Sequence, residues 1–241
     1  MTEVSGDKFL LSPENQEKVV LVDSRRDTVL SEIVLKAKPR FICMVDSQQA
    51  ATTLDNKTIQ FIKINQNTLI DDGVVNVNVN VLGIAAHNNN IVVSYDPPGV
   101  QIISKNGAVI HKLDNTITGR EVFLKPRWIT TTSDGSIYVT DWGTNKITRL
   151  DSSLTILHTF AWPMLVGPHG LLAMNGDQLI VCNYRKDNIV LIEPSSSSMT
   201  VILEKQHGIE GPCSICFCKE QKKLYVAPVV ETSNIMVYKL L

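Results

Sequence analysis

The sequence predicts an all-β protein built from one repeated unit, and three observations lead to this prediction. Short apolar runs rich in β-branched residues, such as 137–140 and 188–192, alternate with tight turns of Gly, Asn, Asp and Ser. No segment keeps an apolar period of 3.6 residues over three helical turns. A Pro-X-X-apolar pattern recurs along the chain at a spacing of about 43 residues.

The spacing of this pattern identifies the repeat. Its four prolines, at intervals of 87, 42 and 44 residues, are Pro39, Pro126, Pro168 and Pro212. The first interval is about twice the others, so it predicts a further copy near position 82, where residues 82–85 fit without a proline. Each copy continues through three more short runs. Four strands in about 43 residues is the size of one propeller blade.

Six copies fit the chain, which predicts a single-domain, six-bladed β-propeller of four-stranded antiparallel blades. The approximate blades are residues 1–36, 37–79, 80–122, 123–165, 166–209 and 210–241. Residues 6–11 align with 176–181, so the first blade is clipped at its start. Residues 234–240 form a third strand, so the last blade lacks its outer strand. We expect the chain to be the C-terminal part of a longer protein whose upstream residues supply that strand; a natural three-stranded blade is the alternative.

Composition narrows the classes of partner and compartment. The 241 residues carry a net charge of −1, which gives no general attraction to DNA or to acidic membranes. No apolar run approaches the roughly 18 residues that span a bilayer, and the first residues lack the pattern of a signal peptide. Five cysteines, an odd number, fit a reducing compartment. We therefore expect a cytoplasmic protein with no membrane and no DNA partner.

Residues 126–147 closely resemble an NHL repeat, whose pattern is a proline, an apolar strand, an Asp-Gly turn, an I-Y-V-x-D strand and an N-x-I strand. Here the turn is 134–135, the second strand 137–141 and the third 145–147. Weaker copies occur at 183–189 and 224–227. The divergent copies are similar to the C-terminal propellers of tripartite-motif (TRIM-NHL) proteins. That resemblance implies the substrate-recognition domain of a ubiquitin ligase, with a protein or an RNA as target. No RING, B-box or coiled coil occurs in this chain, so ligase activity would reside elsewhere.

In a propeller, ligands usually meet the face that carries the blade-to-blade connections and the loops between second and third strands, which we call the upper face. The residues that follow the proline position enter this face near the central channel: Arg40, Gly83, Arg127, His169 and Cys213. None is acidic, which argues against the central calcium of lactonase-like propellers. We expect no catalytic residue, no metal and no cofactor; a metal-dependent hydrolase or lyase propeller is the weaker alternative.

Basic and aromatic residues cluster in the upper-face loops, mainly in the fourth and fifth blades. The predicted ligand-binding residues are Arg40, Arg127, Trp128, Trp142, His169, Tyr184, Arg185 and Lys186. Arginine forks bind the carboxylates of a protein or peptide, which is the predicted partner. The same residue types suit single-stranded RNA through phosphate contacts and base stacking, which is the alternative. Solvated loop charges beside tryptophans that only pack the blades are the structural alternative.

Two further groups have structural interpretations. Asp55, Asp96 and Asp141 recur at the ends of second strands, where the NHL pattern uses aspartate as a turn residue. Cys213, Cys216 and Cys218 lie near His207 and suggest a metal site. Because residues three apart on a strand face opposite sides, Cys213 and Cys216 do not share one tetrahedral ion without a bulge. We interpret the three cysteines as small buried apolar residues.

Overall fold

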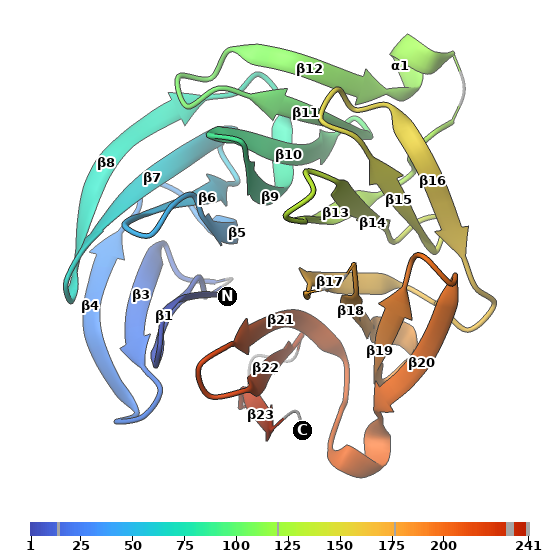
Figure 1. Ribbon diagram of the computed structural model, residues 1–241. Coiled ribbons are helices and arrows are strands. Elements are labelled where there is room, and N and C mark those ends of the chain that lie inside the picture. Colours follow the sequence, from blue (N-terminus) through green and yellow to red (C-terminus); the bar gives the residue numbers. More distant parts are fainter. Residues whose placement is uncertain (14, 120, 176, 230–233, 240–241) are drawn as a thin grey trace.

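The computed structural model describes residues 1–13, 15–119, 121–175, 177–229 and 234–239. It confirms the predicted fold class. Six antiparallel sheets are arranged around a central channel, and within each sheet the strand order follows the sequence order (Figure 1). Over the described residues, five sheets have four strands and the last has three. Among the described residues, no helix is long and apolar enough to cross a membrane.

The elements have the following bounds. Blade 1 contains β1 (Thr2–Ser5), β2 (Lys8–Leu11), β3 (Lys18–Asp23) and β4 (Thr28–Val34). Blade 2 contains β5 (Pro39–Met44), β6 (Gln49–Leu54), β7 (Thr58–Asn65) and β8 (Thr68–Asn76). Blade 3 contains β9 (Asn80–His87), β10 (Asn90–Asp96), β11 (Gly99–Ile103) and β12 (Val109–Asp114), followed by the short helix α1 (Asn115–Thr118).

Blade 4 contains β13 (Pro126–Thr131), β14 (Ile137–Asp141), β15 (Lys146–Leu150) and β16 (Ile156–Ala161). Blade 5 contains β17 (Pro168–Ala173), β18 (Leu179–Asn183), the 3-10 turn η1 (Tyr184–Lys186), β19 (Asn188–Glu193) and β20 (Ser198–Leu203). A second 3-10 turn, η2 (Lys205–His207), leads to blade 6, which contains β21 (Pro212–Cys218), β22 (Lys223–Pro228) and β23 (Met236–Lys239).

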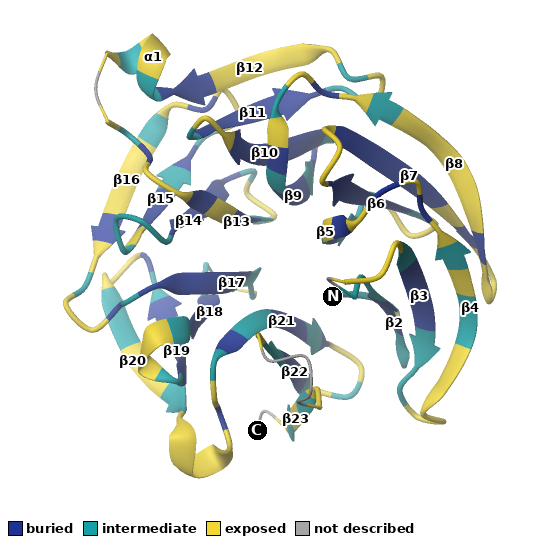
Figure 2. Cartoon of the chain, turned by 180° about the vertical axis from the view of Figure 1, so that it is seen from behind, coloured by how far each residue is buried: buried dark blue, intermediate teal, exposed yellow. Residues whose placement is uncertain are grey.

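Burial explains why the strands differ in composition. All residues of β14 and β18 are buried, because the second strand of a blade is covered on both faces by neighbouring blades. Such strands have continuous apolar runs and no alternating pattern. The outer strands β12 and β16 are largely exposed (Figure 2), and each mixes polar with apolar residues.

Hydroxyl side chains join neighbouring blades at one repeated position near the end of the second strand. Thr53 Oγ1 donates to the carbonyl of Leu82 at 2.8 Å, and Ser94 Oγ donates to the carbonyl of Arg127 at 2.8 Å. Beside the latter contact, a Cβ built on Gly83 would lie 1.7 Å from the Arg127 carbonyl oxygen. Only glycine fits where β9 comes this close to β13.

Side-chain packing closes the ring between blade 6 and blade 1. The rings of Phe9 and Tyr225 lie 4.4 Å apart, and the Tyr225 hydroxyl lies 3.2 Å from Ser24 Oγ. Cys218 Sγ donates to the Gly6 carbonyl at 2.9 Å, and Cys216 is buried in the same apolar cluster. These two cysteines therefore serve as packing residues at the junction. β1 supplies a short innermost strand to blade 1, and the sheet of blade 6 has three strands.

Candidate ligand-binding face

The end of the second strand in blade 4 is fixed by one buried carboxylate. Asp141, 1% exposed, accepts four backbone N–H groups: Leu124 at 2.7 Å, Lys125 at 3.0 Å, Gly143 at 2.9 Å and Thr144 at 3.1 Å. It thereby joins the incoming blade connection to the loop between β14 and β15. This is the structural role predicted for Asp141, and it sets the position of the following residue, Trp142.

In blade 5, Asn183 joins the incoming blade connection to the end of the second strand, as Asp141 does in blade 4. Asn183 Oδ1 accepts the Val166 N–H at 2.7 Å, and its Nδ2 donates to the Met164 carbonyl at 2.9 Å. The next residue, Tyr184, begins η1, and Arg185 and Lys186 follow with exposed side chains. Polar residues at the strand ends thus present the aromatic and basic residues of two adjacent blades on the upper face.

Three of the predicted residues form a continuous aromatic stack across blades 4 and 5. The rings of Trp128 and His169 lie 4.3 Å apart with an interplanar angle of 26°. His169 and Tyr184 lie 4.5 Å apart and 6° from parallel. Phe41, from blade 2, meets Trp128 edge-on at 5.2 Å. Trp128 and His169 are each only 8% exposed, so this aromatic stack belongs to the interior of the upper face.

Cations lie over Trp142, whose ring centre is 6.5 Å from that of His169, and beside Trp128 in the stack. The Lys125 ammonium lies 4.7 Å from the centre of the Trp142 ring, and the Arg185 guanidinium lies 4.8 Å from it. Both distances lie within the range of cation–π attraction. Arg127 is 6.0 Å from the Trp128 ring. The face is therefore cationic outside and aromatic beneath.

This environment keeps His169 neutral. Burial is the main cause that lowers the pKa of the His169 imidazole to about 4, and the nearby Arg127 and Arg185 guanidinium groups contribute to the same shift. Among the described residues, neither His169 Nδ1 nor Trp142 Nε1 has a hydrogen-bond partner, although both atoms are buried. The positive potential here thus comes from the guanidinium groups and not from the imidazole.

Ion pairing differs between the two faces. Arg25, Arg26 and Arg149, near the opposite ends of the blades, pair with Asp7, Asp23 and Asp134 at 2.7, 3.9 and 3.0 Å. Within the described ranges, the upper-face arginines Arg40, Arg127 and Arg185 form no ion pair. Arg120, in the connection between blades 3 and 4, lies outside the described residues. Among the described residues, the arginines near the opposite ends of the blades are therefore paired with carboxylates, and those of the upper face are not.

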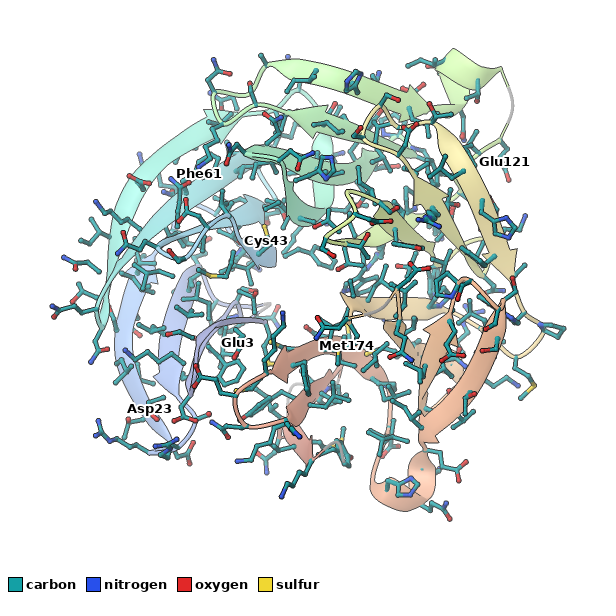
Figure 3. The ribbon with its side chains drawn as sticks, in the orientation of Figure 1. Glu3, Asp23, Cys43, Phe61, Glu121 and Met174 are labelled. Carbon is teal, nitrogen blue, oxygen red and sulfur yellow. The ribbon has the colours of Figure 1, made fainter. Side chains whose placement is uncertain are left out.

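Two further residues of the connections between blades, Trp162 and Glu121, lie apart from the stack. Trp162 packs on Phe160 at 5.6 Å and donates its Nε1–H to the Ser197 carbonyl at 3.0 Å. Glu121 lies at the outer rim of the propeller, away from the channel (Figure 3). Arg40 forms no ring contact with the stack and instead lines the channel. Phe41, which completes the stack, was not predicted, because its contact depends on the distance between blades 2 and 4.

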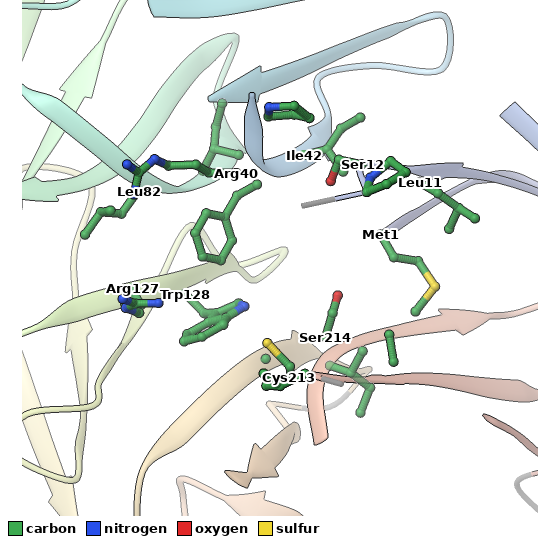
Figure 4. Close-up of a pocket in the computed structure, with 18 of the residues that line it drawn as sticks. Met1, Leu11, Ser12, Arg40, Ile42, Leu82, Arg127, Trp128, Cys213 and Ser214 are labelled. Carbon is green, nitrogen blue, oxygen red and sulfur yellow. The ribbon is translucent and has the colours of Figure 1, made fainter. Parts of the chain in front are cut away.

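The upper end of the channel holds a pocket of about 750 Å³, which we call the channel pocket (Figure 4). Its basic residues are Lys38, Arg40 and Arg127, and Asp55 is the acidic residue among the described lining. Asp55 Oδ1 accepts the Lys38 N–H at 3.2 Å. Within the described ranges, no three His, Cys, Asp or Glu side chains gather closely enough to hold a metal ion.

Comparison with known proteins supports the fold. In sequence, no family model and no curated protein matches the chain. Among solved structures, a streptogramin B lyase aligns with a TM-score of 0.72 at 15% identity, covering 100% of this chain and 82% of that one. A virginiamycin B lyase from Staphylococcus aureus aligns with a TM-score of 0.67 at 17% identity, over 99% and 85%.

A functionally unknown protein from Desulfotomaculum acetoxidans aligns with a TM-score of 0.71 at 13% identity, over 98% of this chain and 76% of its own. At such identities the likeness shows a shared six-bladed β-propeller fold and says nothing about shared chemistry. The resemblance to NHL and TRIM-NHL propellers rests on the sequence pattern alone.

Proposed function

We propose that this propeller is a non-catalytic binding platform that recruits an acidic protein or peptide segment on its upper face. The observation that carries the proposal is the difference in ion pairing. Arg25 and Arg149 have carboxylate partners, whereas Arg40, Arg127 and Arg185 have none among the described residues. Unpaired guanidinium groups gathered on one face are suited to bidentate contacts with carboxylates of a partner.

The aromatic stack favours a peptide over RNA. Stacking of RNA bases requires free ring faces. The His169 ring already has Trp128 against it at 4.3 Å and Tyr184 at 4.5 Å, and Trp142 is in contact with two cations. These rings are used to hold the face rigid. A rigid, positively charged face of this kind supports recognition of an acidic segment at a low cost in ordering.

The TRIM-NHL resemblance gives this platform a cellular role, in which the propeller selects the target of a cytoplasmic ubiquitin ligase whose catalytic RING lies in another part of the protein or in a partner. The residues that we assign to recognition are Arg40, Arg127, Arg185 and Lys186 for charge, and Trp128, Trp142, His169 and Tyr184 for shape. Neither a metal nor a cofactor is part of the proposal.

A binding selection tests it directly. The purified protein is incubated with a bead-bound library of random decapeptides and, separately, with a random RNA pool, each at several salt concentrations. We expect enrichment of Asp- and Glu-containing peptides, weakened tenfold or more by R185Q and by raised salt. The matched control is R25Q, which removes an exposed arginine from the opposite face and should leave binding unchanged.

Three outcomes would overturn the proposal. Selection of a short RNA motif with no peptide enrichment would replace the peptide partner with RNA. Equal loss of peptide binding in R25Q and R185Q would show that the charge of the upper face is not what selects the ligand. A stoichiometric metal ion together with turnover of ester or lactone substrates would show that the propeller is an enzyme.

A further inference from the structure

We propose that the channel pocket receives the C-terminal residue of the peptide partner. Arg40 and Arg127 bind its terminal carboxylate, and its apolar side chain enters the channel. This inference rests on the proposed function and specifies how the partner is anchored.

The two arginines occupy equivalent positions on blades 2 and 4, which flank blade 3. Arg40 follows the first residue of β5 and Arg127 follows the first residue of β13. The blade between them has Leu82 at this position, because the carbonyls of Leu82 and Arg127 accept equivalent hydroxyl hydrogen bonds, from Thr53 and Ser94. Gly83 corresponds to Trp128, since each donates its N–H to the hydroxyl at the end of the second strand. Both arginines line the channel pocket, where they lie on the same side, on either side of Leu82 (Figure 4). Neither has an ion-pair partner within the described residues, so an incoming carboxylate meets no competing acid on them.

An apolar ring lies one step deeper in the channel. The apolar residues of the Pro-X-X-apolar pattern line the pocket, and each is 7 or 8% exposed: Ile42, Ile129, Leu171 and Ile215. They stand two positions after the channel-mouth residues, farther along each innermost strand, and each also packs in an apolar cluster between neighbouring blades. The repeated sequence pattern thus builds two levels around the axis, a partly basic mouth and, below it, an apolar ring.

A basic mouth above an apolar ring fits a ligand that carries a carboxylate and an apolar group close together. A C-terminal residue carries its carboxylate and its side chain on the same carbon, so the first can remain at the mouth while the second enters the apolar ring. An internal Asp or Glu places its charge at the tip of the side chain, with nothing apolar beyond it. A volume of about 750 Å³ is large enough for one or two residues and lies in the usual range of small-ligand sites.

The test compares two versions of one library. Random decapeptides are attached to beads through their N-termini, and each C-terminus is either a free carboxylate or an amide. We expect at least tenfold greater enrichment from the free-carboxylate version, with Leu, Ile, Val, Met or Phe as the last residue. R40Q and R127Q should each abolish this preference, and R25Q should retain it. Circular dichroism of each variant confirms that these exposed positions leave the fold intact.

Competition with a small molecule tests binding of the terminal carboxylate separately from the rest of the peptide. N-acetylleucine should displace a selected peptide, whereas N-acetylleucine amide, which lacks the charge, should not. Acidic peptides enriched equally from both versions of the library, in a manner sensitive to R185Q, would overturn the C-terminal anchor and leave the proposed function standing. Failure of both versions to bind would remove the proposed function together with this inference.

Discussion

At the scale of single residues, His169 shows how packing determines a charge state. Its ring is stacked between Trp128 and Tyr184, and two guanidinium groups lie close enough to oppose protonation. The pKa lies near 4, below the ordinary value of 6.5, because the buried cation would lose hydration and face like charges. His169 therefore stays neutral at the pH values where a solvent-exposed histidine becomes charged.

This shift predicts an acid-dependent loss of stability. Between pH 6.5 and 4 the unfolded chain binds a proton at position 169 that the folded chain does not, so the free energy of unfolding falls as pH falls. One such proton changes the free energy of unfolding by at most about 1.4 kcal/mol per pH unit. Urea denaturation across this range should show a shallower pH dependence in H169Q than in the natural chain. Identical slopes for the two proteins would contradict the shift.

Asp141 is the residue on which the upper-face loop of blade 4 depends. D141A leaves four backbone N–H groups without their acceptor at a buried position, and should lower the free energy of unfolding by about 3 kcal/mol. D55A is the matched comparison, because Asp55 is exposed and accepts one N–H; its cost should be below about 1 kcal/mol. Urea melts measure both, and equal costs would show that Asp141 is not a structural acceptor.

At the scale of elements, neighbouring blades are joined where the second strand of one meets the innermost strand of the next. Ser94 is fully buried there: its Oγ accepts the Gly83 N–H at 2.9 Å and donates to the Arg127 carbonyl at 2.8 Å. One hydroxyl thus connects β10, β9 and β13. It also fixes the backbone of Arg127, a residue of the proposed anchor.

S94A should therefore lower the free energy of unfolding and, because it frees the backbone of Arg127, weaken peptide binding. It leaves a buried donor and a buried acceptor unpaired, which should cost about 2 kcal/mol in urea denaturation. S153A, which removes an exposed hydroxyl from the loop between β15 and β16, should cost less than about 0.5 kcal/mol. Equal urea midpoints for S94A and S153A would contradict the expected difference in stability.

At the scale of the whole molecule, closure of the ring depends on the junction of blades 6 and 1. The apolar cluster there, which includes Phe9, Cys216, Cys218 and Tyr225, is the smallest of the six found in the described residues. Stability of a repeat protein is approximately a sum over units and their interfaces. The smallest interface should therefore be the first to open.

F9A tests this expectation. Phe9 is 2% exposed, and its truncation should cost about 3–5 kcal/mol. Hydrogen exchange should then show protection lost first in β1, β2 and β22, while β10 and β14 in the opposite part of the ring stay protected under native conditions. Uniform loss of protection around the ring would show that the propeller opens as one unit and not at this junction.

The fold could be predicted because each repeat carries the same local sequence pattern. Pro126 and its counterparts mark the innermost strands, and the apolar runs mark the strands covered on both faces. The period locates the third blade without its proline, but the predicted register is wrong by one residue. The structure places Leu82, and not Gly83, at the position of Arg127, because without the proline no local signal marks the start of the strand. The strand bounds of blade 6 were harder to predict, since β23 pairs on one side only and its composition carries little of the buried pattern.

The candidate site could be predicted by residue type and only in part by geometry. Trp128, His169 and Tyr184 follow strand positions that the repeat places on one face. Their stacking on one another depends on distances between blades, which no local pattern encodes. The sequence could not predict that Arg127 and Arg185 lack ion-pair partners, because an ion pair depends on which loops of different blades come within 4 Å.

The outer edge of blade 6 affects the behaviour of the protein at high concentration. Within the described residues β23 hydrogen-bonds to β22 on one side and to no strand on the other. An open edge is a template for pairing with another chain, and long flat edges promote aggregation. Within the described residues this edge is the four-residue strand Met236–Lys239, whose Lys239 is exposed, so two such strands offer few hydrogen bonds and bring like charges together. Shortness and charge thus protect the edge from self-association.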